Sequence, residues 1–94
     1  MRYRILSVGI DLDLLSTRQA LLASRGYDSL IATPADFEEK LSSGKFDLVI
    51  LSVMLSGEEK RHIQAKLPAG TRSLVLQSLV WPKELLKMVA DALG

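Results

Sequence analysis

Residues 47–57 constrain the fold more than any other part of this chain. They read Asp-Leu-Val-Ile-Leu-Ser-Val-Met-Leu-Ser-Gly, and the apolar run Leu48–Leu51 is unbroken. Such a run suits a central strand that is buried on both faces, as in parallel sheets. The run ends at the polar residue Ser52, and ligands of open α/β sheets bind where strands end in this way. The residue at position 52 therefore bears directly on function.

Composition narrows the possible classes of protein. The chain has 94 residues, no cysteine, one histidine and a formal net charge of +1. This length suits one small domain, which we predict to span residues 1–94. Without cysteine there is neither a disulfide framework nor a thiolate nucleophile, and one histidine is too few for a histidine-based metal site. The basic residues form no block, which argues against nucleic acid as the partner. We expect a cytoplasmic protein with no membrane partner, because no signal-peptide core or membrane span is evident.

Strand-like and helix-like segments alternate four times along the chain. The predicted strands are residues 4–8, 28–32, 48–51 and 73–80, and the predicted helices are residues 11–25, 34–43, 58–67 and 82–93. This alternation predicts a three-layer α/β fold with a doubly wound parallel sheet. Right-handed crossovers favour the strand order 2-1-3-4. That order places the first and last helices on one face of the sheet and the middle two on the other.

Local signals predict how the helices begin and which way they face. Asp11 is a predicted N-cap, because its carboxylate can accept hydrogen bonds from free backbone N–H groups. Thr33 and Pro34 predict the start of the second helix. In the first helix, Arg18 is expected to point away from an inward face composed of Leu14, Leu15, Leu21 and Leu22.

Six short pieces of the chain carry a family resemblance. They are Ile5-Leu6-Ser7-Val8 leading to Asp11, Asp13-Leu14-Leu15, the helix end at Arg25-Gly26-Tyr27, residues 46–51, Met54-Leu55-Ser56-Gly57 and residues 81–86. In this order they resemble the receiver domain of two-component response regulators, over nearly the whole chain. The resemblance implies a flavodoxin-like fold. It also implies that the fourth helix and fifth strand of the family are missing, because the predicted fourth strand runs almost directly into the last helix.

The resemblance places the phosphorylation and metal positions of the family on unsuitable residues. The phosphoacceptor aspartate falls on Ser52. The two carboxylates that hold Mg²⁺ fall on Gly9 and Ile10, and only the neighbouring Asp11 is acidic. Mg²⁺ requires oxygen ligands, usually including carboxylates, and phosphoryl transfer relies on charge neutralisation. We therefore predict a degenerate pseudo-receiver with no metal, no cofactor and no enzymatic activity.

The remaining positions of the phosphoryl switch are also altered. The Ser or Thr that responds to the phosphoryl group falls on Gln77 or the adjacent Ser78, and the lysine before the proline falls on Trp81. We interpret Trp81 as a plug that covers the strand end, with an anchor for a partner as the alternative. His62 is interpreted as a solvated surface residue rather than a base for Ser52, because no orienting third residue is evident.

The predicted fourth strand lies at an open edge of the sheet, with no fifth strand beside it. Its apolar residues are Leu74, Val75, Leu76, Leu79 and Val80. A long apolar edge pairs with another chain unless it is covered. We therefore predict a signalling module that acts through protein–protein contact, either with a partner protein or as a homodimer formed through this edge. Two alternatives stay open: an atypical phosphoacceptor that uses Ser52 or Asp11, and a small ligand-binding doubly wound domain.

Overall fold

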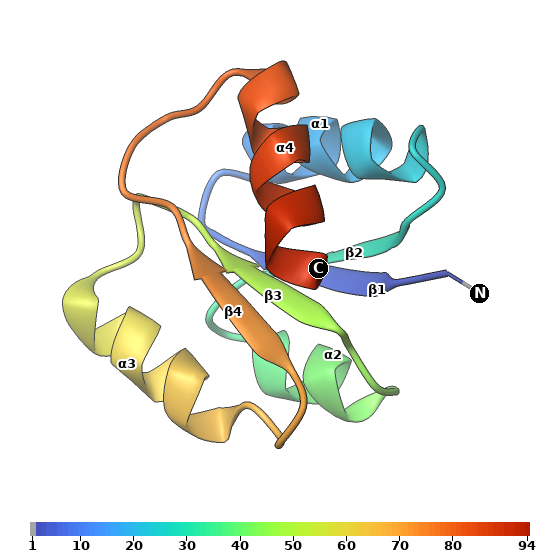
Figure 1. Cartoon of the computed structure of the whole chain (residues 1–94). Helices are drawn as coiled ribbons and strands as arrows, with labels where there is room; N and C mark the ends of the chain where they lie inside the picture. Colours follow the sequence, from blue (N-terminus) through green and yellow to red (C-terminus); the bar gives the residue numbers. More distant parts are fainter. Residues whose placement is uncertain (1) are drawn as a thin grey trace.

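The structure is a computed structural model and describes residues 2–94. Strands and helices alternate along the chain (Figure 1), and their bounds are β1 (Arg4–Val8), α1 (Leu12–Ala23), β2 (Asp28–Ala32), α2 (Phe37–Ser42), β3 (Leu48–Leu51), α3 (Gly57–Lys66), β4 (Arg72–Val75) and α4 (Pro82–Leu93). All neighbouring strands are parallel, and the sheet has the order β2-β1-β3-β4. The predicted doubly wound sheet and its strand order are confirmed.

Two helices cover each face of the sheet, as predicted. Figure 1 shows α1 and α4 on one side and α2 and α3 on the other. Every residue of β3 is fully buried, because its side chains alternate between two apolar clusters. Leu48 and Ile50 pack on the side of α1 and α4, whereas Val49 and Leu51 pack on the side of α2 and α3. The central position predicted for this strand is confirmed.

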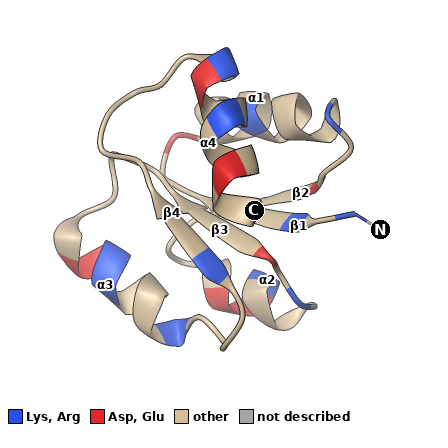
Figure 2. Ribbon diagram, in the orientation of Figure 1, with Lys and Arg blue, Asp and Glu red and all other residues tan. Residues whose placement is uncertain are grey.

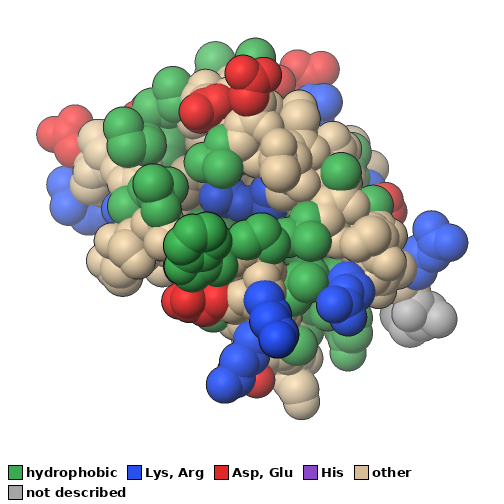
Figure 3. Space-filling model, turned by 90° about the horizontal axis from the view of Figure 1, so that it is seen from above, with side chains coloured by type: hydrophobic (Ala, Val, Ile, Leu, Met, Phe, Trp, Pro, Cys, Tyr) green, Lys and Arg blue, Asp and Glu red, His purple; other side chains and the backbone are tan. Residues whose placement is uncertain are grey.

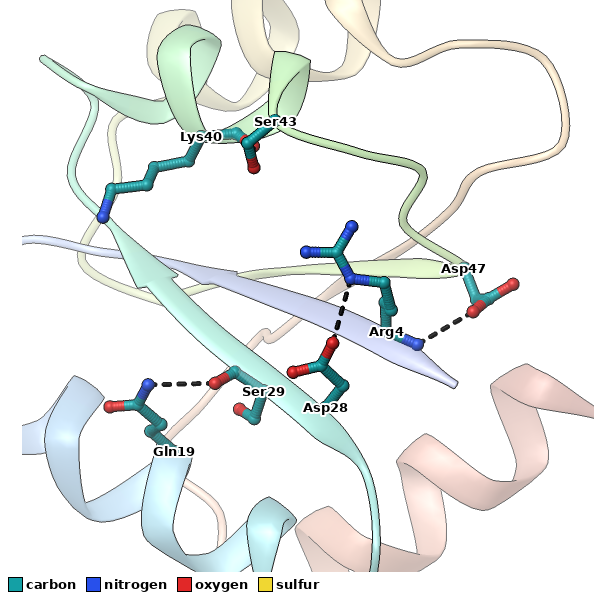
Figure 4. Close-up of polar contacts among 7 residues, drawn as sticks. All are labelled: Arg4, Gln19, Asp28, Ser29, Lys40, Ser43 and Asp47. Atoms are coloured by element: carbon teal, nitrogen blue, oxygen red, sulfur yellow. Dashed lines mark hydrogen bonds and ion pairs between the residues drawn. The ribbon is translucent and has the colours of Figure 1, made fainter. Parts of the chain in front are cut away.

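Polar contacts join the strands at the amino end of the sheet (Figure 4). The side chain of Arg4 donates from Nε to Asp28 Oδ2 at 3.0 Å, and its backbone N–H donates to Asp47 Oδ2 at 2.8 Å. The Arg4 guanidinium also lies 4.6 Å from the centre of the Phe46 ring. These contacts link β1 to β2 and to the segment that leads into β3. They help to fix the register in which the opposite, carboxyl ends of the strands come together.

Side-chain hydrogen bonds explain where α1 and α2 begin. Asp11 Oδ1 accepts from the backbone N–H groups of Asp13 and Leu14 at 3.1 and 3.2 Å, which confirms its role as the N-cap of α1. The start predicted for α2 is wrong, since this helix begins at Phe37 rather than at residue 34. Asp36 Oδ1 accepts from Thr33 N at 2.6 Å and from Thr33 Oγ1 at 3.1 Å. These bonds hold residues 33–36 in a turn, and the helix follows that turn.

Strand β4 is shorter than the sequence predicts. It ends at Val75, and the last hydrogen bond to β3 beyond it runs from Leu76 N to Leu51 O at 3.0 Å. The prediction that the strand continues to Val80 is therefore wrong. Leu76 belongs to the apolar cluster that includes Leu85 and Val89 of α4, and Val80 packs against this cluster. Packing on a helix, rather than pairing in a sheet, explains that part of the apolar pattern.

Candidate functional site at the carboxyl ends of the strands

Gly9 and Ser52 lie one step beyond β1 and β3. Gly9 N donates to Ala32 O at 3.1 Å, and Ser52 N donates to Val8 O at 3.0 Å, so both residues extend the hydrogen-bonded ladder. They are in close contact, because a Cβ atom added to Gly9 would lie 2.5 Å from Ser52 Oγ and 3.2 Å from Leu15 Cδ2. No side chain can extend from position 9 without displacing a neighbour. Packing has closed the space that a carboxylate at this position would occupy.

The hydroxyl of Ser52 is buried and is bound to an arginine. The side chain of Arg18 donates from Nη1 to Ser52 Oγ at 2.9 Å, and the two residues are only 6% and 3% exposed. Arg18 comes from α1, whose buried residues are Leu15, Arg18 and Leu22. The expectation that Arg18 points away from the core is wrong. Burial lowers the pKa of Arg18 from its ordinary value, because the charged form loses hydration.

Arg18 is the site residue that the sequence analysis missed. Its position three residues after Leu15 and four before Leu22 places it on the same helix face as both. The signal was therefore present in the spacing. Arginine is an unexpected residue on a buried helix face, because it is seldom fully buried without a partner.

The residues at these strand ends do not fit a magnesium ion. Gly9 offers no ligand, and the side chain of Ile10 is apolar and 56% exposed. The carboxylate of Asp11 accepts hydrogen bonds from the first turn of α1. Throughout residues 2–94, no three His, Asp or Glu side chains come together as a metal-binding group. Mg²⁺ is normally held by carboxylates together with phosphate and water, and this arrangement supplies no such set.

The connection from β4 to α4 contains Gln77, Ser78 and Trp81. All three are exposed. The side chain of Trp81 is 78% exposed, so the interpretation of Trp81 as a plug over the strand end is wrong. Figure 2 shows that this connection carries no charged residue. An exposed tryptophan in an uncharged loop leaves the alternative of a partner-binding anchor open.

His62 lies away from Ser52, on the side of the sheet covered by α2 and α3. Its Nε2 lies 3.2 Å from Glu38 Oε1, and its ring packs edge-on against Phe37 with 5.7 Å between ring centres. The side chain is more than half exposed. The prediction that His62 is a surface residue is confirmed.

Most of the exposed large hydrophobic side chains lie at the carboxyl end of the sheet. Among residues 2–94 there are six, and all except Tyr3 come from the connections after β1, β3 and β4 or from the first residue of α1. We call these five residues the apolar rim: Ile10, Leu12, Met54, Leu79 and Trp81. Figure 3 shows hydrophobic side chains gathered on the face seen from above, with basic side-chain atoms set between them.

The fold is that of CheY-like response regulator receiver domains. The crystal structure of a response regulator receiver domain protein (CheY-like) from Methanospirillum hungatei JF-1 is similar with a TM-score of 0.71 and 20% sequence identity, over 99% of this chain and 94% of that chain. A chain from the complex of histidine kinase ThkA with response regulator protein TrrA has a TM-score of 0.69 and 22% identity, over 98% of this chain and 99% of that chain. No family model matches the sequence, and no curated protein matches it. The predicted flavodoxin-like receiver fold is confirmed.

Helix length and composition also bear on membrane insertion. None of the helices within residues 2–94 is both long enough and apolar enough to cross a bilayer.

Proposed function

We propose that this chain is a non-enzymatic, response-regulator-like signalling module that acts as a single receiver-like domain through protein–protein contact, without aspartyl phosphorylation. One observation carries the proposal: a buried serine bound to a buried arginine occupies the end of β3, the position to which the family resemblance assigns the phosphoacceptor. A neighbour with the same fold, from the complex of a histidine kinase with a response regulator, supports contact with another protein as the mode of action.

The contacts of Ser52 and Asp11 argue against either residue as a phosphoacceptor. A kinase needs access to the hydroxyl, whereas Ser52 is 3% exposed and its oxygen accepts from Arg18. The described residues place no general base beside this hydroxyl, and a serine without one is a weak nucleophile. Asp11 accepts two backbone hydrogen bonds, so phosphorylation there would remove the N-cap of α1.

Incubation with acetyl phosphate and Mg²⁺, followed by intact mass spectrometry, tests the absence of phosphorylation. We expect no phosphoryl adduct under conditions that modify a phosphorylatable receiver domain in a parallel reaction. A single stoichiometric adduct would refute the proposal. The variants Ser52→Ala and Asp11→Asn would then identify the acceptor, because the adduct disappears only when its own acceptor is replaced.

The apolar rim is the surface that best fits contact with a partner protein. Exposed apolar side chains that gather on one end of a molecule mark interaction sites more often than scattered ones do. Its most exposed members, Leu79 and Trp81, are 75% and 78% exposed. Tryptophan is also enriched among the residues that dominate binding energy at interfaces.

The edge of β4 supports a second mode of contact, a homodimer. Leu74 and Val75 lie on this edge strand and are partly exposed, whereas Leu76 is buried and Leu79 and Val80 lie beyond the strand. The candidate edge is therefore four residues long, which limits the number of hydrogen bonds that a second strand could add.

Sedimentation velocity over a range of protein concentrations tests the homodimer. Arg72 N donates to Asp47 O and Leu76 N donates to Leu51 O, so by alternation the N–H of Ser73 points outward. Ser73→Pro removes this outward donor without breaking the internal ladder. We expect self-association of the wild type and a weaker dimer for Ser73→Pro. A wild-type protein that stays monomeric at the highest concentration excludes the homodimer and leaves contact with a different protein.

A further inference from the structure

A small cavity lies between α1 and the start of α4. It has a volume of about 60 Å³, enough for a few water molecules or a carboxylate group. Its lining residues come from both helices and from the residues before α4: Leu14, Thr17, Arg18, Leu21, Val80, Pro82 and Leu85. Arg18 is the only charged residue among them. A cationic group in an otherwise largely apolar cavity needs an anionic or polar partner.

Arg18 has no anionic partner in the part of the chain described here. The ion pairs within residues 2–94 join Arg4 to Asp28 and His62 to Glu38, and neither includes Arg18. Its single side-chain hydrogen bond uses Nη1, with Ser52 Oγ as the acceptor. The N–H groups on Nε and Nη2 make no hydrogen bond within residues 2–94, and they are not among the fully buried unpaired atoms, which are Ser7 Oγ and Ser29 Oγ, so they remain accessible to a ligand. A planar guanidinium with free donors on one side is well suited to bind a carboxylate.

The first turn of α4, whose Pro82 and Leu85 line this cavity, adds a second positive feature beside it. Its N-cap is Trp81, whose side chain accepts no hydrogen bond, and Pro82 occupies the first helical position. The first hydrogen bond of the helix runs from Leu85 N to Trp81 O at 2.9 Å. The N–H groups of Lys83 and Glu84 are therefore left without a capping acceptor. Such helix starts favour anions, through free N–H groups and through the helix dipole.

An apolar pocket adjoins this cavity. It has a volume of about 360 Å³ and is lined by Leu79, Val80 and Trp81. Val80 lines both spaces, so the two lie next to each other. The part of the cavity beside Arg18 suits a charged head group, and the pocket at Leu79 and Trp81 suits a hydrocarbon stem.

We propose that this groove binds a carboxylate on an apolar stem, with the carboxylate on Arg18 and the first turn of α4 and the stem against Leu79, Val80 and Trp81. The carboxylate belongs either to an acidic side chain of a partner protein or to a free aliphatic acid, and the two sources share this chemistry. The site does not depend on the proposed signalling role. It also differs from the position of Gly9 and Ser52, which packing has closed.

Fluorescence of Trp81, the single tryptophan of the chain, provides the measurement. The protein is titrated with sodium acetate, butyrate and hexanoate at constant ionic strength, with sodium chloride as the control. We expect a saturable change with each carboxylate. Affinity should rise by up to about fourfold for each methylene that leaves water, so hexanoate should bind at least roughly tenfold more tightly than acetate. The absence of saturation with all three carboxylates overturns the proposal, as does a chloride response equal to that of hexanoate.

Two further arms distinguish the source of the carboxylate. A capped tripeptide with glutamate between two leucines is compared with the same peptide carrying glutamine. Tighter binding of the glutamate peptide than of hexanoate supports an acidic side chain of a protein, and the reverse order supports a free aliphatic acid. Inorganic phosphate that binds as tightly as hexanoate overturns the role of the apolar stem.

Variants test the assigned contacts. Arg18→Gln should weaken hexanoate binding at least tenfold, and Arg18→Lys should retain part of it. Leu79→Ser should reduce the advantage of hexanoate over acetate while acetate binding persists. Unchanged binding by Arg18→Gln overturns the proposal. If that variant fails to fold, the ¹⁵N–¹H signal of Arg18 Nε in the wild type gives the answer, because hexanoate must shift it in a saturable manner.

Discussion

Replacing Gly9 with alanine tests whether packing has closed the strand ends. The added Cβ atom would lie 2.5 Å from Ser52 Oγ, 3.0 Å from Ser52 Cβ and 3.2 Å from Leu15 Cδ2. Gly9 is not among the glycines with positive φ, so alanine meets a packing cost rather than backbone strain there. Forcing an extra carbon into a packed core costs about 1–3 kcal/mol.

Two further effects, of opposite sign, adjust this free energy. Alanine lowers the conformational entropy of the unfolded chain, which stabilises the fold by about 0.4–1 kcal/mol. In the opposite sense, a displaced Ser52 weakens its hydrogen bond with Arg18, and bonds to charged groups contribute about 1.5–3 kcal/mol. We therefore expect Gly9→Ala to lower the free energy of unfolding by about 1–3 kcal/mol.

Urea unfolding followed by far-ultraviolet circular dichroism measures this loss. With an m-value near 1 kcal/mol per molar urea, the midpoint should fall by about 1–3 M. Gly57→Ala is the matched control, because its added Cβ has one near neighbour, Arg61 Nη1 at 3.5 Å. This control should be neutral or slightly stabilising.

A double variant separates the contact with Ser52 from other effects. Ser52→Gly removes the atoms that lie 2.5 and 3.0 Å from the added carbon. In that background, Gly9→Ala should cost at least about 1 kcal/mol less than in the wild type, since residues in contact give non-additive changes. The reasoning fails if Gly9→Ala is as stable as the wild type, or if the two changes are additive.

The remaining predictions concern the caps and the core, and the same unfolding assay checks them. Asp11→Ala should cost about 1 kcal/mol, because the carboxylate caps α1 through two backbone N–H groups; a stability equal to the wild type would contradict this role. Ser56→Ala should cost a similar amount, since Ser56 and Glu59 form a reciprocal capping box at α3, and an unchanged midpoint would count against it. Leu85→Ala should cost about 2–5 kcal/mol because Leu85 is 4% exposed, whereas Leu79→Ala, at a side chain 75% exposed, should stay within about 0.5 kcal/mol. Equal losses for the two leucines would show that their burial is misassigned.

Local sequence patterns were sufficient to predict the architecture. Four alternations of strand and helix, together with right-handed crossovers, predicted the strand order that the structure has. The unbroken run Leu48–Leu51 predicted the central strand, and Asp11 predicted the cap of α1. These features depend on local periodicity and on chain handedness, which short stretches of sequence contain.

The residues that fill the strand ends could not be predicted, because their contacts join parts of the chain that are distant in sequence. Arg18 binds Ser52 across 34 residues of sequence, and the burial of an arginine depends on that distant partner. The end of β4 at Val75 and the exposure of Trp81 follow from where the chain leaves the sheet to reach α4. An apolar residue looks the same in sequence whether it packs on a strand, packs on a helix or faces solvent. Non-local packing decides between these environments. At the end of β3 it places Ser52 against Gly9 and in a hydrogen bond with Arg18, a cation that has no anionic partner within residues 2–94.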